Sequence, residues 1–496
     1  MQEKNMEFDI VIKGAKVVDG LGGPAVAADV AILGDRIARI GDGAQWTARE
    51  FVDAGGKVVA PGFIDCHTHD DRLLLSSPLM RPKVSQGITT VITGNCGISL
   101  APISVPGETI VPPLNLIAKQ RGDLFGTMRE YAAALADNPA AVNSAALVGH
   151  SSLRVSVMDR LDRPADKDEI AAMRRALDIA LSHGAVGLST GLYYPTAVHS
   201  STEEVIGVAA PLAHWNGVYT THLRDEGDHI CDAMEEAFTI GRAADVPAIL
   251  SHHKVMGKHN HGRTVETLAL YDKARKNQPL GMDLYPYVAS STVLDTRRLA
   301  DSDKVLITWS QTRPDVKGQD LFELARREGK DPVALAGELQ PAGAIYFSMD
   351  EGDVKRIMGY DQVMIGSDGL PHDTAPHPRL WGAFSRVLGR YSRDLHVLGM
   401  EEAVRKMTSL TAAKFGLKDR GVLKAGCYAD IVMFDPDTVA DAATFLSPLQ
   451  PSVGIACVMV NGTVVERDGV PTGARPGRFI GNEDRSAPGL DVPAWA

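Results

Sequence analysis

Two histidines one residue apart follow an apolar run in the segment APGFIDCHTHDD, residues 60–71. Side chains of an extended segment alternate between faces, so Asp65, His67 and His69 share one side. Two imidazoles on one side can bind the same cation. An isolated His-x-His pair is as typical of a strand that ends in a loop, so the rest of the chain must decide between these interpretations.

Four further candidate ligands occur where later apolar runs end. They are Cys96 in TTVITGNCGIS, His222 in GVYTTHLRDEG, His252 in AILSHHK and Asp368 in VMIGSDGLPHD. Each residue alone fits an ordinary buried or turn position, and His253 is an alternative to His252. Their recurrence at the same place in successive units favours one shared site, because the C-terminal strand ends of a βα barrel meet on one face.

The donor types of these six residues indicate zinc. Thiolate with imidazole suits Zn²⁺ and disfavours Mg²⁺ or Ca²⁺, whereas imidazole with carboxylate accepts Zn²⁺ among other divalent ions. We therefore predict a tight site and a second, weaker neighbouring site. The tight site consists of Cys96, His222 and His252, and the weaker one of His67, His69 and Asp368.

Apolar runs of strand length alternate with helical stretches over the middle of the chain. Runs such as GAVGLSTGLYYP and VPAILSHHKV are separated by stretches such as KDEIAAMRRALDIALSHG, and Ser201 followed by Glu204 predicts a capping box. Repeated βα units predict a parallel sheet of the α/β class. Because no Gly-x-Gly-x-x-Gly follows the first strand, a closed (β/α)8 TIM barrel is favoured over a dinucleotide-binding sheet.

Both ends of the chain consist of short predicted strands. ADVAILGDRIARIG and IACVMVNGTVVERDG each carry a turn between apolar runs, which predicts two hairpins. A polar, helix-containing stretch interrupts the barrel pattern and predicts an insertion or lid. The predicted division is a β domain from 1–60 and 417–480, a barrel over 61–416, the insertion at 288–344 within it, and a C-terminal tail at 481–496.

Charge and cysteine content exclude several classes of partner. The formal net charge of -11 argues against nucleic acid and against an anionic membrane surface. No apolar run approaches the roughly 20 residues of a membrane span, and the start MQEKNMEFDIVIKG has no apolar signal-peptide core, so we expect a cytoplasmic protein. Five scattered cysteines without a CxxC pair fit reduced thiols. A negatively charged substrate would need local cations for its binding.

Several motifs resemble a known family. PGFIDCHTHDD resembles the strand-one signature of the amidohydrolase superfamily, and GNCG, THLRDE, SHHK, DLYPY, GSDGLPHD and PHPRLWG, in this order, resemble the D-aminoacylase (N-acyl-D-amino-acid deacylase) family. Most amidohydrolases bridge their metals with a carboxylated Lys where this family uses the Cys of GNCG, here Cys96. The resemblance covers nearly everything from Phe8 to Phe479. It implies a metal-bearing barrel with a small β domain built from both chain termini and an insertion subdomain.

The resemblance also implies an activity and roles for residues. The activity is zinc-dependent hydrolysis of the amide bond of small N-acyl-D-amino acids, with the tight zinc on Cys96, His222 and His252, a second position on His67, His69 and Asp368, and Asp368 as catalytic acid and base. The clamp for the substrate carboxylate falls on Lys254, Tyr285 and Arg298, with Ser291 as a weaker candidate, and the side-chain pocket on Tyr193, Tyr346 and Met349. Ser348 is polar at a position that looks apolar in members acting on hydrophobic substrates, and Arg297 adds a second cation beside Arg298. An acidic D-amino acid is therefore also a candidate substrate. The resemblance leaves the acyl group and the oligomeric state open.

Two alternatives come from other classes of function. A cyclic-amide hydrolase of the hydantoinase or dihydropyrimidinase type would use the same barrel and metals, but Cys96 in place of a bridging Lys and the carboxylate clamp argue against it. A barrel that serves only as a binding or scaffold protein would be expected to lose metal ligands. No predicted ligand is missing here.

Overall fold

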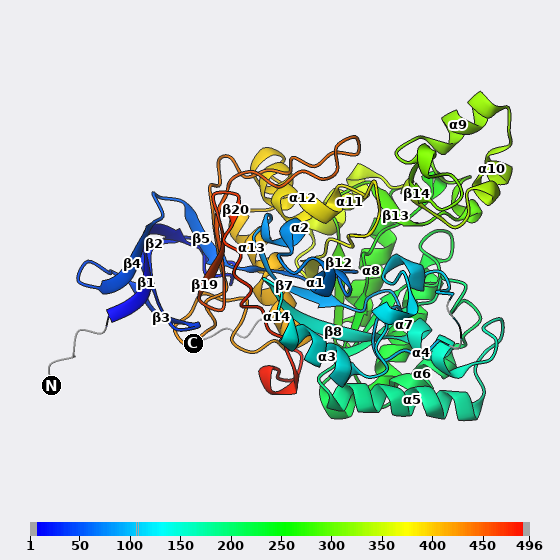
Figure 1. The fold of residues 1–496 in the computed structure, drawn as a ribbon, viewed down its shortest axis with the longest axis horizontal. Coiled ribbons are helices and arrows are strands. Elements are labelled where there is room, and N and C mark those ends of the chain that lie inside the picture. The colour runs from blue at the N-terminus through cyan, green and yellow to red at the C-terminus, as the bar shows by residue number, and fades with distance from the viewer. Residues whose placement is uncertain (1–6, 106, 108, 490–496) are drawn as a thin grey trace.

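The computed structural model describes residues 7–105, 107 and 109–489. A β-rich sheet lies at one end, a barrel of strands and helices lies in the centre, and α9 (Leu321–Glu328) and α10 (Pro332–Glu338) project at the far end (Figure 1). Residues 1–6 of the predicted β domain and 490–496 of the predicted tail lie outside the described residues. Within the described part of the chain, no helix combines the length and the apolar composition that crossing a bilayer requires.

Eight strands form one sheet in which all neighbours run parallel, which confirms the predicted α/β barrel. The segments that follow the first and last strands also contact each other. The amide of Asp368 donates to the carbonyl oxygen of His67 at 2.8 Å, and Thr68 and Gly369 form a parallel β-bridge. In sheet order the strands are β16 (Val363–Ile365), β12 (Leu280–Leu284), β11 (Ala248–Leu250), β10 (Val218–His222), β9 (Gly187–Gly191), β8 (Asn143–Gly149), β7 (Ile88–Thr93) and β6 (Phe63–Asp65).

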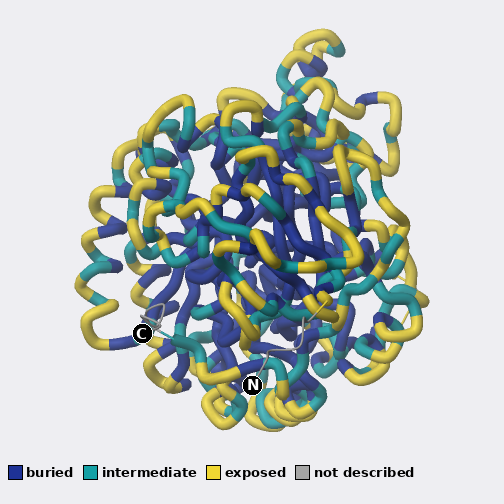
Figure 2. Tube along the Cα trace, turned by 90° about the vertical axis from the view of Figure 1, so that its left-hand side faces the viewer, coloured by how far each residue is buried: buried dark blue, intermediate teal, exposed yellow. Residues whose placement is uncertain are grey.

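The barrel strands are buried along their whole length. Strands that are covered on both faces are apolar without strict alternation, as these runs are. Their inward side chains form one buried cluster that includes Ile64, Ile92, Leu147, Ile249 and Met364. Figure 2 shows this buried backbone at the centre of the molecule with exposed loops around it.

Helices follow the strands and cover the barrel. The longest begins after the N-cap Asp166, whose side chain accepts from the amides of Asp168 and Glu169, so the orphan amides of the first turn are satisfied. The helices are α1 (Leu73–Ser76), α2 (Arg81–Val84), α3 (Met128–Asp137), α4 (His150–Val157), α5 (Lys167–Ser182), α6 (Thr202–Ala209), α7 (Ile230–Ala244), α8 (Thr264–Ala274), α11 (Glu351–Gly359), α12 (Arg379–Arg386), α13 (Met400–Met407) and α14 (Ser409–Phe415).

Strands from both ends of the chain form a single nine-stranded sheet, which confirms the predicted terminal β domain. The two ends join where β5 and β17 pair antiparallel, with Val59 opposite Met433. Both predicted hairpins are present, as the pairs β2–β3 and β18–β19. The strands are β1 (Glu7–Val17), β2 (Val26–Leu33), β3 (Arg36–Gly41), β4 (Thr47–Asp53), β5 (Val58–Pro61), β17 (Ile431–Phe434), β18 (Ile455–Val460), β19 (Thr463–Arg467) and β20 (Val470–Pro471).

The insertion is a three-stranded antiparallel sheet with its own core. Its strands are β13 (Ala289–Val293), β14 (Lys304–Ser310) and β15 (Ala342–Phe347), with β15 in the middle. Leu321, Leu324 and Leu335 of α9 and α10 pack into this separate apolar cluster. The short 3-10 helix η5 (Thr296–Arg298) connects β13 to β14. It lies next to the site described below.

Candidate metal and catalytic site

The six predicted ligands come from five different strand ends and lie together. His67 and His69 follow β6, Cys96 follows β7, His222 ends β10, His252 follows β11 and Asp368 follows β16. The side chains of all six are nearly or fully buried. The carboxyl ends of parallel barrel strands share one rim, so residues up to about three hundred positions apart meet there.

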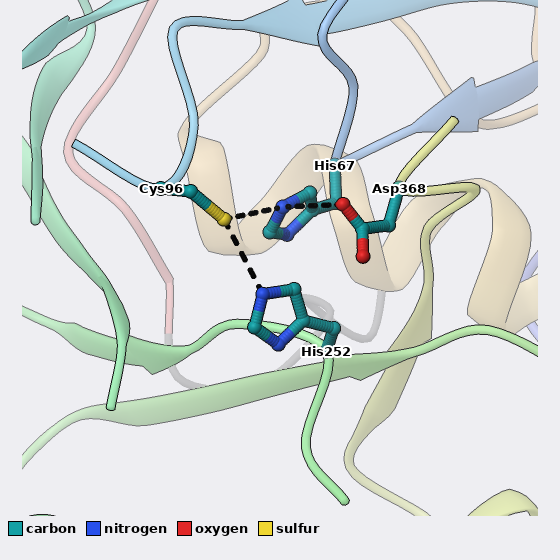
Figure 3. Close-up of side chains that lie close together, drawn as sticks. All are labelled: His67, Cys96, His252 and Asp368. Atoms are coloured by element: carbon teal, nitrogen blue, oxygen red, sulfur yellow. Dashed lines mark hydrogen bonds and ion pairs between the residues drawn. The ribbon is translucent and has the colours of Figure 1, made fainter. Parts of the chain in front are cut away.

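The sulfur of Cys96 is the centre of the cluster. It lies 3.3 Å from Nε2 of His67, 3.3 Å from Nε2 of His252 and 3.8 Å from Nδ1 of His222. Figure 3 shows the sulfur pointing toward the rings of His67 and His252, with Asp368 beside His67. Oδ1 of Asp368 lies 3.6 Å from Nε2 of His67 and 3.2 Å from Nε2 of His69.

These distances between the side-chain nitrogen, sulfur and oxygen atoms fit a bound metal ion. Nitrogen and sulfur ligands at tetrahedral angles around Zn²⁺, with bonds of about 2.0 and 2.3 Å, are about 3.5 Å apart. The donor atoms of His67, Cys96, His252 and Asp368 all lie within 4.8 Å of one another. His67 is as near to the sulfur as His252, so the two predicted ligand groups form one continuous cluster around Cys96.

Three of these residues have a left-handed backbone, which is unusual outside glycine. φ is 53° at Cys96, 38° at His252 and 49° at Asp368. Such conformations cost about 1–3 kcal/mol each and concentrate at functional sites. Gly191 in β9 allows the Cys96 loop to approach, because a Cβ at this position would lie 2.2 Å from the Cys96 carbonyl oxygen.

The surroundings favour the thiolate form of Cys96. Burial alone raises the pKa of a thiol, but His67 and His252 lower the pKa of Cys96 well below its usual value. The thiolate is the form that binds metal ions. Cys66 differs, since burial raises its pKa well above the usual value of a thiol and its sulfur donates to the Ile365 carbonyl oxygen.

Two buried carboxylates hold the outward nitrogens of the histidines. Glu226 lies 3.5 Å from Nε2 of His222 and 3.2 Å from Nδ1 of His252. Asp283 lies 3.4 Å from Nδ1 of His67 and accepts from the amide of His252 at 2.9 Å. Carboxylates in such positions fix the tautomer and the orientation of metal-binding imidazoles. The nitrogens that face Cys96 are therefore left free to bind a metal.

Asp368 is held by a buried arginine. Nη1 of Arg379 lies 2.8 Å from Oδ2 of Asp368. Burial raises the pKa of this carboxyl, but Arg379 and His252 together lower the pKa of Asp368 well below its usual value. The carboxylate is thus ionised and able to accept a proton.

A buried lysine connects the strands that carry Asp368 and His67. Nζ of Lys83 lies 2.8 Å from Oδ2 of Asp65 and 2.7 Å from Oγ of Ser367, and the amide of Ser367 donates to Oδ1 of Asp65 at 2.8 Å. Asp65 ends β6 two residues before His67, and Ser367 directly precedes Asp368. This network therefore fixes the position of both segments.

The predicted clamp residues have different neighbours in the structure. Lys254 is bound to Glu226 and lies 2.8 Å from Nδ1 of His252. Nε of Arg298 donates to the hydroxyl of Tyr193 at 3.1 Å. The ring of Tyr285 lies 4.5 Å from the guanidinium carbon of Arg379, and the carbonyl oxygen of Ser291 accepts from Nη2 of Arg379 at 3.0 Å.

A small pocket lies in front of the cluster. The described residues that line it do not include Tyr193 or Tyr346. The rings of these two tyrosines lie 4.3 and 5.7 Å from the guanidinium carbon of Arg298. Met349 lines an adjoining cavity with Tyr285. The described residues that line the pocket are His69, Leu116, Tyr194, His222, Glu226, His252, Lys254, Ser290, Ser291, Thr292, Arg298, Asp368 and Leu370.

Sequence reasoning did not identify Glu226, Asp283, Arg379 or Lys83. Three of them stand in motifs that the resemblance uses, since Glu226 ends THLRDE, Asp283 begins DLYPY and Arg379 is part of PHPRLWG. A carboxylate or an arginine in a motif gives no sign of which distant residue it contacts. Lys83 has no signal of its own in the sequence.

Comparison with known proteins agrees with this geometry. The model of the Amidohydrolase family matches residues 50–258 and 263–466. Over 97% of this chain and 99% of its own length, the D-aminoacylase of Alcaligenes xylosoxydans xylosoxydans is 51% identical. The N-acyl-D-aspartate deacylase of that organism is 50% identical over 99% of this chain and 97% of its own length, and its N-acyl-D-glutamate deacylase is 48% identical over 97% of both.

Solved structures also match. The N-acyl-D-glutamate deacylase of Bordetella bronchiseptica, complexed with zinc and a phosphonate inhibitor, superposes with a TM-score of 0.93 at 45% identity, over 96% of this chain and all of the other. An L-hydantoinase of Arthrobacter aurescens, with a TM-score of 0.58 at 17% identity over 96% of this chain and all of the other, shows only that the fold is shared. The family match, the near full-length identity and the cysteine-centred cluster agree. The chain belongs to the D-aminoacylase family of the amidohydrolases.

Proposed function

We propose that this protein is a zinc-dependent deacylase that hydrolyses N-acyl-D-amino acids to a carboxylate and a free D-amino acid. The observation that carries the proposal is the buried cluster in which the Cys96 sulfur lies 3.3–3.8 Å from three imidazole nitrogens, with the Asp368 carboxylate beside them. The names of relatives at 48–51% identity describe this class of reaction.

Cys96, His222 and His252 would hold the tight zinc, and His67, His69 and Asp368 a second, weaker ion. When bound, zinc supplies a Lewis acid that polarises the scissile carbonyl and makes water more acidic. The zinc complex of the Bordetella deacylase supports the choice of metal. The borderline-soft sulfur and nitrogen donors support it independently.

Asp368 would move the proton during hydrolysis. Water must lose a proton as it attacks the amide carbon, and the departing nitrogen must gain one. The ionised Asp368 carboxylate accepts the first proton and donates it to the leaving nitrogen, a role that contributes typically 10²–10⁴-fold to a rate. Its second oxygen is held by Arg379, so the carboxylate stays in place while it exchanges the proton.

The carboxylate of the leaving amino acid needs hydrogen-bond donors that are not already bonded to other protein groups. Among the described residues, Oγ of Ser291 and Nε of Arg379 are buried without a hydrogen-bond partner, and the hydroxyl of Tyr285 contacts the sulfur of Met349 at 3.8 Å. These three groups lie together, because Arg379 stacks on Tyr285 and binds the Ser291 backbone. We therefore assign the α-carboxylate to Tyr285, Ser291 and Arg379. Lys254 supports the site through Glu226.

A direct assay tests the proposed function. Protein reconstituted with zinc is incubated with N-acetyl-D-glutamate, N-acetyl-D-methionine, their L enantiomers and a hydantoin, and both free amine and ring opening are followed. We expect amine release from at least one D substrate, little from the L forms and no ring opening. Ring opening without amine release would establish the cyclic-amide reaction instead. Protein that binds no zinc and releases no amine would be a scaffold.

A further inference from the structure

The loop between β17 and β18 brings the terminal β domain into contact with the catalytic barrel. It spans residues 435–454 and extends from the terminal sheet to α12, the helix that begins with Arg379 (Figure 1). Ala440 and Val453 pair across it as an antiparallel bridge, which braces its two halves. Connections longer than about 12–15 residues are uncommon between neighbouring elements and are usually functional. We therefore examined what this 435–454 loop contacts.

Two polar contacts hold the 435–454 loop against the far end of α12. Oδ2 of Asp441 lies 2.9 Å from Nη1 of Arg386, and the hydroxyl of Ser452 lies 2.6 Å from that of Ser385. The approach is close at Gly382, where a Cβ would lie 2.8 Å from Cβ of Asp441. The β domain therefore fixes the C-terminal half of this helix.

Phe445 of the same loop packs behind the wall of the active site. Its ring centroid lies 4.9 Å from that of His377 and 4.8 Å from that of Phe347 in β15. His377 is only 1% exposed, and its Nδ1 accepts a hydrogen bond from the amide of Arg379 at 3.0 Å. The Phe445 ring therefore packs against the imidazole that holds the first residue of α12.

Arg379 connects this support to the groups proposed to react. Nη1 lies 2.8 Å from Oδ2 of Asp368, and the guanidinium carbon lies 4.5 Å from the ring centroid of Tyr285. A series of contacts thus runs from the β domain through His377 and Arg379 to the proposed base. Removal of the Phe445 ring would leave a gap at the start of this series, because neighbours fill such a cavity only in part.

We propose that Phe445 is a positioning residue of the active site, through which the terminal β domain holds Arg379 against Asp368 and the α-carboxylate of the substrate. This rests on the proposed function, in which Arg379 binds that carboxylate and Asp368 moves the proton. A misplacement of reacting groups by about 1 Å can cost about 10²-fold in rate. The small β domain then takes part in the reaction and does not serve the stability of the fold alone.

Phe445→Ala tests the proposal in the zinc-loaded enzyme. The variant keeps every proposed metal ligand and every described side chain that lines the pocket, so its zinc content should equal that of the wild type. KM for N-acyl-D-amino acids should rise about 10-fold and kcat/KM should fall about 10–100-fold, because Arg379 loses its support. A smaller folded fraction alone would lower kcat and leave KM unchanged. Phe445→Leu keeps an apolar contact and should retain most of the wild-type values.

Leu446→Ala is the matched control. Leu446 follows Phe445 in the same loop, but it is 93% exposed. KM and kcat should both be unchanged in this variant. Circular dichroism and thermal melting verify that each variant is folded.

Crystal structures of the wild type and of Phe445→Ala give a measurement that does not depend on turnover. The distance from Nη1 of Arg379 to Oδ2 of Asp368 should lengthen beyond about 3.5 Å in the variant, past the range of a hydrogen bond. An unchanged distance would overturn the inference even if KM rises, and so would wild-type KM and kcat/KM in Phe445→Ala. If the wild type hydrolyses no substrate, the proposed function fails, and the same distance still decides whether Phe445 positions Arg379.

Discussion

Nη1 of Arg379 lies 2.8 Å from Oδ2 of Asp368, and both side chains are buried. Asp368 lies in the segment that follows β16, and Arg379 is the first residue of α12. This ion pair leaves the other oxygen, Oδ1, directed at His69 and His67. One oxygen of the proposed base is thus fixed by the scaffold and the other faces the site where the reaction would occur.

Replacement of the proposed base should separate metal binding from turnover. Asp368→Ala removes the proton acceptor but none of the three tight ligands, so we expect about one tightly bound zinc per chain and a kcat lower by roughly 10³-fold or more. Metal analysis after dialysis and initial rates measure the two effects. Near-normal turnover in this variant would refute the role of Asp368.

Loss of the sulfur should remove the metal itself. Cys96→Ala deletes the donor that lies within 3.8 Å of all three imidazole nitrogens, so we expect the zinc content after dialysis to fall well below one per chain. Amine release should fall with it. Cys66→Ala is the control, because Cys66 is also a buried cysteine beside a predicted ligand, His67, but its sulfur donates to the Ile365 carbonyl oxygen at 3.2 Å. Retained zinc in Cys96→Ala would contradict the tight site.

Local patterns predicted the barrel and the ligands because both signals are local. A buried strand is apolar over its own few residues, and Cys, His and Asp are recognised as donors by their type. The partners of Glu226, Arg379 and Lys83 are set by contacts across the barrel, which no local pattern reports. Ser201 and Glu204 illustrate the same limit: Ser201 accepts from the Glu204 amide as predicted, but the Glu204 side chain turns inward to Arg154 and His150 and does not complete the capping box.

Glu226 should tune zinc affinity without being a ligand. Glu226→Gln keeps the shape of the side chain but removes the negative charge beside the outward nitrogens of His222 and His252. We therefore expect the zinc dissociation constant to rise about 10–100-fold. Competition with a chelator measures it. Glu204→Gln is the matched control, because Glu204 is also buried and also contacts a histidine, His150, at 3.1 Å, but lies in a separate network with Arg154. It should lower stability and leave zinc affinity unchanged; an equal change in both variants would contradict a specific role for Glu226.

His253 should affect stability in acid and not the metal. Its ring points away from the cluster, with Nε2 2.9 Å from the hydroxyl of Thr267 in α8, so His253→Gln should retain zinc, whereas His252→Gln should lose it. Burial and the charge of Lys254 lower the pKa of His253 to about 4. The unfolded chain takes up this proton near pH 6.5 and the folded chain only near pH 4, so wild-type stability falls as the pH drops through this window.

The His253→Gln variant has no such proton to take up. Its free energy of unfolding should therefore decline less than that of the wild type between pH 6.5 and 4, by up to about 3 kcal/mol. Its melting temperature should decline less as well. Thermal melts at several pH values measure the difference, with His214→Gln, at an exposed position, as the control. Parallel curves for the wild type and His253→Gln would show that His253 is not the residue that resists protonation, and loss of zinc in His253→Gln would make it, and not His252, the ligand.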